Sequence, residues 1–194
     1  MIRDTQHFLR RIIDLVIGIA LLPIAVPICL LAMIVIRVES EGSPLFVQKR
    51  VGRHQKPFLL FKLRTMAARS GDLPSHEINP MHITRVGALL RRTKIDELPQ
   101  LLNVLNGSMS LVGPRPCLPS QQLLISERDR HGLFVLLPGV TGPGQLAGLD
   151  MSDPVRLAQV EADYFRDGTP LRDMLLIART ALGGGRGDAA TKSR

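Results

Sequence analysis

Two adjacent carboxylates, Asp96 and Glu97, are the residues of this sequence best suited to chemistry. They precede Pro99 and an apolar series that ends at Asn106-Gly107, a pattern that predicts the first turn of a helix. The free N–H groups of a helix N-terminus favour the ionised form of a carboxylate. An ionised Asp96 could act as a nucleophile, and Glu97 could help to hold Mg²⁺, which prefers oxygen ligands. Ordinary first-turn acids give the same pattern, so the pair alone does not establish a site.

Three cationic side chains are candidates for binding a phosphate group. Lys62 and Arg64 are two residues apart in a stretch that we expect to be extended, so both should project from one face of a strand. Two cations on one face repel unless an anion lies between them, but two solvent-exposed side chains are the simpler interpretation. Arg115 stands between two prolines, Pro114 and Pro116, whose rings orient it as bidentate binding of phosphate requires. A plain surface loop is an equal alternative.

Composition excludes several other kinds of site. Two cysteines cannot form a disulfide framework, and the cysteines and five histidines show no metal-ligand spacing. The sequence has no Trp and one Tyr, which argues against the aromatic platforms of single-strand nucleic-acid binders. The glycine-rich stretch 138–148, which contains Gly142, matches neither the GxxxxGK(S/T) nor the GxGxxG phosphate-binding pattern, so it is a weak signal.

The charge of the chain is unevenly distributed. The formal net charge is +8, and residues 37–94 carry 12 Lys and Arg against 4 Asp and Glu. Residues 95–173 carry 6 Lys and Arg against 10 acids. The basic block could attract anionic lipid headgroups or a polyanionic ligand, or it could be an ordinary solvated surface.

One apolar segment near the N-terminus concentrates the hydrophobicity of the chain. Leu15 to Ile36 includes no charged side chain, and a straight helix of this length spans roughly 33 Å, enough for the hydrocarbon core of a bilayer. The run is long for a signal peptide, and no small-x-small cleavage site follows it before Arg37. We therefore expect a membrane segment rather than a cleaved leader.

The sequence of this segment is compatible with two courses through the membrane. Pro23 and Pro27 each remove a backbone donor and predict a kink or a break. Arg10 and Arg11 precede the run and Arg37 follows it, so the positive-inside rule assigns no orientation. A kinked span and a re-entrant hairpin, which enters and leaves on the same face, fit equally well.

Short elements are expected after the apolar segment. Apolar runs near residues 45–47 and 58–60 flank a polar loop and predict a β-hairpin. Residues 67–82 and 138–148 are predicted to be loops, and residues 184–194 a disordered tail. Helices are expected in four further places, namely residues 87–92, residues 119–131, and two stretches beginning at Pro154 and Pro170.

The motifs, taken together, resemble one family. Residues 90–116, LRRTKIDELPQLLNVLNGSMSLVGPRP, closely resemble the signature of the small monotopic bacterial phosphoglycosyl transferases, the bacterial sugar transferase family. The sequence KLRTM at 62–66 is similar to the family's K-x-K/R-T-M motif, and PGVTG at 138–142 is similar to its P-G-I-T-G loop. RIID at 11–14 is similar to its R-x-x-D motif. The matches occur in order from about Arg10 to Leu182.

The resemblance implies an α/β fold, mostly α with a small β-hairpin. Residues 1–37 would form a re-entrant membrane helix-turn-helix with its turn at Pro27, and residues 38–183 a small catalytic domain packed on it. The family break is at Ser-Pro, whereas Val26 precedes Pro27 here. The implied location is the bacterial inner membrane, with the catalytic domain on the cytoplasmic face.

The resemblance also implies a reaction and its residues. A sugar 1-phosphate would pass from a UDP-sugar to polyprenyl (undecaprenyl) phosphate with release of UMP, as the first membrane step of glycoconjugate assembly. Asp96 corresponds to the family's nucleophile, which forms a covalent aspartyl intermediate, and Glu97 to its partner, both with Mg²⁺. Lys62 and Arg115 correspond to its conserved cations, and we place Arg64, Pro116 and Gly142 with them at the phosphates.

Departures from the family pattern keep alternatives open. The family usually has an Arg soon after the P-G-I-T-G loop, where Gly148-Leu149-Asp150 stands here. A degenerate transferase that acts as a scaffold is therefore one alternative. A membrane-anchored module that binds nucleic acid or anionic lipid through the basic block is another, although no nucleic-acid motif supports it. The sequence identifies neither the sugar nor the oligomeric state.

Overall fold

The computed structural model describes residues 2–67 and 82–184, so the loop and the tail expected at 67–82 and 184–194 lie almost wholly outside the described residues. Within these ranges the fold is mostly helical, with two small sheets of two strands each. In chain order the elements are α1 (Ile2–Glu39), β1 (Leu45–Val51), η1 (Arg53–Gln55), β2 (Pro57–Leu63), α2 (Arg85–Thr93), η3 (Ile95–Glu97), α3 (Gln100–Leu105), β3 (Ser110–Val112), α4 (Gln122–Arg130), η4 (Leu133–Val135), β4 (Gly139–Thr141), α5 (Pro143–Leu146), α6 (Pro154–Arg166) and α7 (Pro170–Ala181).

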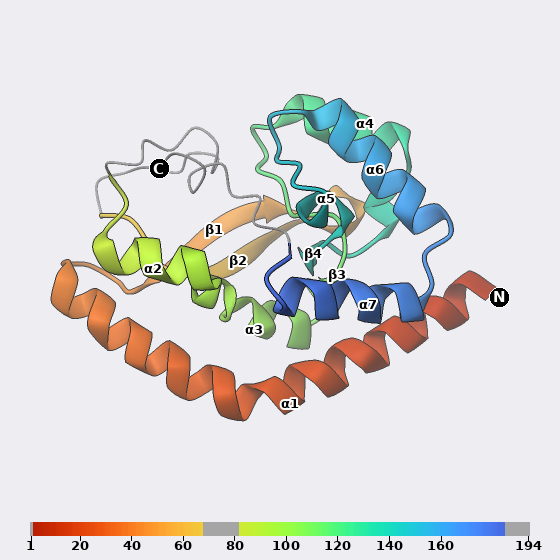
Figure 1. Cartoon of the computed structure of the whole chain (residues 1–194). Helices are drawn as coiled ribbons and strands as arrows, with labels where there is room; N and C mark the ends of the chain where they lie inside the picture. Colours follow the sequence, from red (N-terminus) through yellow and green to blue (C-terminus); the bar gives the residue numbers. More distant parts are fainter. Residues whose placement is uncertain (1, 68–81, 185–194) are drawn as a thin grey trace.

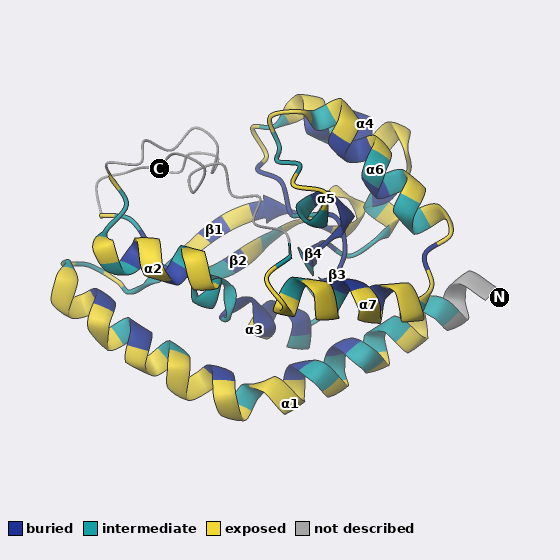
Figure 2. Cartoon of the chain, in the orientation of Figure 1, coloured by how far each residue is buried: buried dark blue, intermediate teal, exposed yellow. Residues whose placement is uncertain are grey.

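The apolar segment forms a single helix. α1 runs for 38 residues and contains both Pro23 and Pro27, so the expected turn between two helices is replaced by a bend near the middle of α1 (Figure 1). A proline inside a helix deletes one hydrogen bond and bends the axis, but the turns on either side can remain helical. By length and composition, Gln6–Glu39 could cross a membrane. Its outer surface is largely exposed, as Figure 2 shows.

The N-terminal half of α1 is fixed to the rest of the domain by charged side chains. Arg10 forms an ion pair with Asp173 of α7 at 2.7 Å. Arg11 donates to carbonyls at the end of α3, and buried Asp14 accepts from the backbone N–H of Leu111 in β3 at 2.8 Å. These contacts give the R-x-x-D stretch a role in attaching α1 to the body.

The C-terminal end of α1 is fixed to the same body. The Arg64 guanidinium donates to the Ser40 carbonyl at 2.7 Å and to the Glu41 carbonyl at 2.6 Å. Ile36 is buried in a cluster with Leu63 and Leu90. Both ends of the bent helix therefore meet one domain, on the concave side of the bend (Figure 1).

The predicted β-hairpin is present, and α3 packs against it. β1 and β2 pair antiparallel, with Leu45 opposite Leu63. The Asn103 side chain makes two hydrogen bonds to the backbone of β2. Its Oδ1 accepts from the Phe61 N–H at 3.1 Å, and its Nδ2 donates to the Leu59 carbonyl at 2.7 Å. Because both bonds join α3 to β2, they fix the position of the helix against the strand.

The glycine-rich stretch is more ordered than the predicted loop. It forms the strand β4 and the short helix α5, and β4 pairs parallel with β3. A pairing between segments so far apart in the chain leaves no local signature in three residues of sequence. The last three predicted helices are α4, α6 and α7; Asp153 and Thr169 cap the N-termini of α6 and α7 through side-chain oxygens.

A glycine at the end of β3 allows the two parallel strands to approach. A Cβ at Gly113 would collide with the Leu137 carbonyl and lie 2.7 Å from the Gly139 nitrogen. Because these are backbone atoms on the neighbouring strand segment, they cannot rotate away as a flexible side chain would. Gly113 therefore sets the path of the chain into the Pro114–Pro116 segment.

We expect Gly113→Ala to destabilise the protein by about 2 kcal/mol or more, because it overpacks two backbone segments. Gly132→Ala is the matched control: Gly132 has φ +67 with no atom within 4 Å of an added Cβ, so only backbone strain of about 1 kcal/mol is expected. Thermal unfolding in detergent should rank Gly113→Ala as the less stable variant. If Gly132→Ala were the less stable variant, the inferred close approach of the backbone at Gly113 would be contradicted.

Candidate active site

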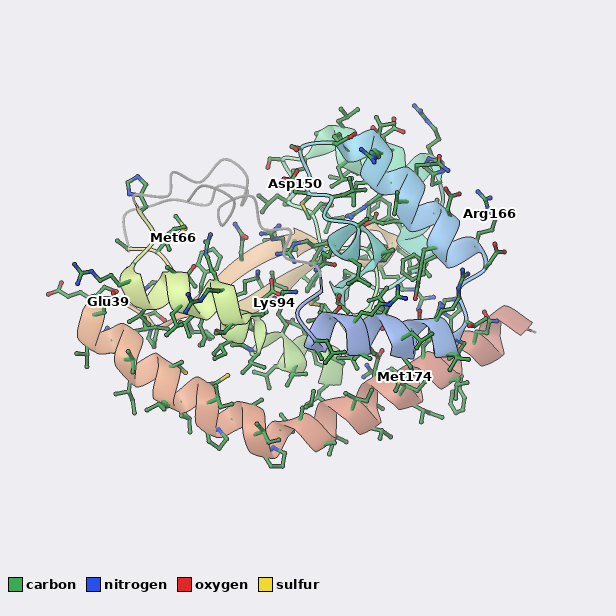
Figure 3. The ribbon with its side chains drawn as sticks, in the orientation of Figure 1. Glu39, Met66, Lys94, Asp150, Arg166 and Met174 are labelled. Atoms are coloured by element: carbon green, nitrogen blue, oxygen red, sulfur yellow. The ribbon has the colours of Figure 1, made fainter. Side chains whose placement is uncertain are left out.

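Asp96 and Glu97 lie in a sharp turn between two helices. α2 ends at Thr93 and is followed by Lys94, whose φ of 58° is left-handed and whose N–H donates to the Arg91 carbonyl. This reversal starts the single turn η3, which carries both acids, so they precede α3 rather than occupy its first turn. Lys94 is labelled near the centre of Figure 3, between α2 and α3. Asp96 is buried, and Glu97 is partly buried.

Three of the predicted site residues meet at the Glu97 carboxylate. Its Oε1 accepts a hydrogen bond from Lys62 Nζ at 2.9 Å and another from Arg115 Nη2 at 3.1 Å. Lys62 comes from β2 and Arg115 from the segment after β3, so the contact joins three separate parts of the chain. All three side chains are partly shielded, with exposures of 14–25 %. Shielding of this kind strengthens ion pairs relative to surface pairs.

The two cations keep Glu97 ionised. Burial by itself would raise the pKa of this carboxyl group, because it penalises the charged form. The charges and hydrogen bonds of Lys62 and Arg115 outweigh burial and lower the pKa of Glu97 to about 2. Glu97 is therefore a carboxylate at neutral pH, and the site holds two cations around one fixed anion.

Arg64 does not share an anion with Lys62. Its guanidinium turns to the end of α1, where it also donates to Ser40 Oγ at 2.9 Å, and the residue is buried. The interpretation that both side chains are solvent-exposed is therefore wrong. A phosphate-binding role for Arg64 stays a prediction that these contacts do not favour. They instead fix the segment that follows α1.

Pro116 and Gly142 contribute through the backbone. The Pro116 carbonyl accepts from Arg50 Nη1 at 3.1 Å. A Cβ at Gly142 would collide with the Gly113 carbonyl, so this glycine permits the segment before Arg115 to pack closely on β4. Both residues thus support the position of Arg115, and their contact with a phosphate stays a prediction.

Asp96 and Glu97 do not form a complete metal site by themselves. Across residues 2–67 and 82–184, no group of three His, Cys, Asp or Glu side chains is placed to hold a metal. Both cations bind the same oxygen of Glu97, Oε1. Mg²⁺ is usually bound by one or two carboxylates together with substrate phosphate oxygens and water. Asp96 and Glu97 can provide those carboxylates.

The sequence did not predict the residues that fix the segments on which the site residues lie. Asn103 fixes α3 to the strand that carries Lys62, and a polar residue inside the apolar series Leu101–Leu105 was the available signal. Arg50 and Arg128 bind the backbone around Arg115, and no short motif distinguishes them from surface arginines. Their roles depend on contacts between residues that are distant in the chain.

Comparison with known proteins identifies relatives along nearly the whole chain. The model of a family described as bacterial sugar transferase matches residues 5–184. The chain is 38 % identical over 180 residues to the UDP-glucose:undecaprenyl-phosphate glucose-1-phosphate transferase of Caulobacter vibrioides, covering 88 % of this chain and 67 % of that protein. It is 43 % identical over 174 residues to an uncharacterized sugar transferase of Bacillus subtilis, covering 89 % and 85 %.

Some relatives are much longer than this chain. The undecaprenyl-phosphate galactose phosphotransferase of Salmonella typhimurium is 33 % identical over 197 residues, which cover 92 % of this chain but 41 % of that protein. The similarity therefore spans less than half of that relative's length.

We expect Lys62→Met to lower stability at pH 7 by about 2 kcal/mol, because it leaves the partly buried Glu97 carboxylate with one cation fewer. The pKa of Glu97 is about 2 in the folded protein, compared with an ordinary value of 4.5. The stabilisation by the ion pair is therefore fully present above pH 4.5 and is lost as the pH falls towards 2. The difference in unfolding free energy between the two proteins should therefore narrow below pH 4.5.

The matched control is Lys56→Met, which removes an exposed lysine from the same hairpin. It should leave stability and its pH dependence nearly unchanged. A destabilisation by Lys62→Met that stays constant from pH 7 to pH 3 would show that the ion pair with Glu97 is not its cause.

Proposed function

The chain belongs to the bacterial sugar transferase family and is a transferase, and from this premise we propose that it moves a sugar 1-phosphate from a UDP-sugar to polyprenyl (undecaprenyl) phosphate. The observation that carries the proposal is the Glu97 carboxylate, held ionised by Lys62 and Arg115 and adjacent in the chain to Asp96. Cations from separate segments that meet at a carboxylate, with a second acidic residue adjacent in the chain, suit a substrate with several phosphate charges.

The proposed reaction proceeds in two displacements. An Asp96 carboxylate oxygen attacks the phosphorus that bears the sugar, a new P–O bond forms, and the bond to the UMP oxygen breaks, so UMP leaves. A phosphate oxygen of the lipid acceptor then attacks the same phosphorus and releases the Asp96 carboxylate. Nucleophilic catalysis of this kind lets the soluble donor depart before the lipid acceptor binds.

The cations would act on the phosphate oxygens. Lys62 and Arg115 lie at the carboxylate next to the nucleophile, where they can neutralise negative charge that builds up during phosphoryl transfer. Asp96 and Glu97 would hold Mg²⁺, which supplies further charge neutralisation at the phosphates when it is bound. Leu149, which replaces the arginine usual in the family, packs in an apolar cluster with Cys117 and Leu157 and offers no charge there.

We also propose that α1 is re-entrant. Its N-terminal half binds α7 and α3, and its C-terminal end binds the segment after β2, so the same domain holds both ends. A straight span would place one end on the far side of the bilayer, away from its partners. A bend near the two prolines, with the exposed apolar surface on its convex side, instead supports entry and exit from the cytoplasmic face of the inner membrane.

The covalent step predicts a mass change. The purified chain, incubated with Mg²⁺ and a panel of UDP-sugars without lipid acceptor, should gain the mass of one phosphosugar with one donor and release UMP. Asp96→Asn should lower UMP release roughly 10³-fold or more and abolish the adduct, because an amide is a poor nucleophile.

Asp163→Asn, which changes an exposed aspartate of α6, is the matched control and should keep both signals. The absence of an adduct and of UMP with every donor would overturn the proposed reaction and favour a non-catalytic scaffold.

The re-entrant course predicts labelling from one side. In a chain carrying Cys29→Ser, single variants Phe8→Cys and Val38→Cys place exposed thiols near the two ends of α1, and Ile24→Cys places one at the bend. A membrane-impermeant maleimide added to inside-out vesicles should label positions 8 and 38 but not position 24. Labelling of the two ends from opposite sides of the membrane would establish a span instead.

A further inference from the structure

Every carbonyl group of the short segment that carries Arg115 accepts a hydrogen bond. Pro114 and Pro116 have no backbone N–H, so they cannot be fixed by donating hydrogen bonds. The carbonyls from Pro114 to Cys117 all accept: Pro114 from the Gly139 N–H, and Cys117 from the Val51 N–H, both at 2.9 Å. The two carbonyls between them accept from side chains.

Both of these side chains are buried guanidinium groups. Arg128 Nη1, from α4, donates to the Arg115 carbonyl at 2.7 Å, and Arg50 Nη1, from β1, donates to the Pro116 carbonyl at 3.1 Å. Hydrogen bonds from a charged donor are stronger than those between neutral groups, and burial strengthens them further. Two successive peptide groups are thus fixed from two elements.

The Arg128 guanidinium is itself fixed. Its Nε and Nη2 donate to the two carboxylate oxygens of Glu161 in α6 at 2.8 and 2.7 Å, and the two side chains are only 3 % and 2 % exposed. A buried ion pair is costly to desolvate, and apolar residues of similar volume often replace one without loss of stability. Stability alone therefore does not explain why this pair is present. Arg128 also donates to the Arg115 carbonyl, which connects the pair to the site.

We propose that Arg50 and Arg128 are positioning residues, which hold the backbone of Arg115 and Pro116 so that the Arg115 guanidinium reaches Glu97 and the substrate phosphates. The assignment rests on the proposed transferase function. Neither arginine touches the reacting atoms. Arg128 binds the peptide group directly after Arg115, and Arg50 binds the next one, so Arg50 acts on Arg115 through the rigid ring of Pro116.

The test is a double-mutant cycle that uses lysine substitutions. Arg50→Lys and Arg128→Lys keep the charge but lose the planar fork that serves two acceptors at once. Each is measured in the unsubstituted chain and in a chain carrying Arg115→Ala, with kcat and KM for UMP release from the active UDP-sugar, and with thermal unfolding. If Arg115→Ala lowers turnover below detection, the cycle is measured through the Kd of UMP by calorimetry.

Arg10→Lys is the matched control. Arg10 also pairs with a buried carboxylate, Asp173, and also donates to a backbone carbonyl, that of Gly168, but in a segment that carries no site residue. It should lower the unfolding temperature about as much as the two test variants and leave UMP release unchanged.

We expect each test variant to lower kcat/KM about tenfold to a hundredfold when Arg115 is present, and by no more than about twofold when Arg115→Ala has removed the group being positioned. Equal losses in both backgrounds, or an equal loss in Arg10→Lys, would overturn the assignment. If the unsubstituted chain releases no UMP from any donor, the proposed function fails and the assignment fails with it; an active chain without the Arg115 dependence refutes the positioning role alone.

Discussion

The Glu97 carboxylate accepts hydrogen bonds from Lys62 and Arg115, which lie 35 and 18 residues away in the sequence. Burial penalises this carboxylate, but the charges and hydrogen bonds of both cations outweigh burial and lower its pKa to about 2. A hydrogen-bonded ion pair of this kind weakens if either cation is displaced, because its strength depends on the distance and alignment of donor and acceptor. The surrounding elements must therefore hold three segments in register to within a hydrogen-bond length.

Each segment has its own support. Asn103 ties α3 to β2 and so keeps η3 beside the strand that carries Lys62. The parallel pairing of β3 with β4, possible because Gly113 has no side chain, directs the chain towards Arg115. These supports are backbone hydrogen bonds and polar side chains on rigid elements, which hold a site more precisely than a free loop does.

The same body fixes the bent helix α1 at both ends. Arg10, Arg11 and Asp14 bind α7, α3 and β3, and Arg64 binds the carbonyls that follow the helix. Because α3 and β3 also border the site, the apolar helix and the reacting groups share one framework. The proposed reaction needs such a framework, because a soluble donor and a lipid acceptor would have to reach the same nucleophile in turn.

The sequence alone determined the features that depend on local chemistry. The charge-free run, the hairpin, the capped helices and the pair Asp96-Glu97 follow from hydropathy, periodicity and turn residues, and the ordered motifs indicate the family. Tertiary structure alone decided which cations meet Glu97, that Arg64 binds the end of α1, and that residues 138–148 form a strand and a helix. These outcomes depend on contacts between distant segments, and a side chain's local sequence does not specify which of several acceptors it will reach.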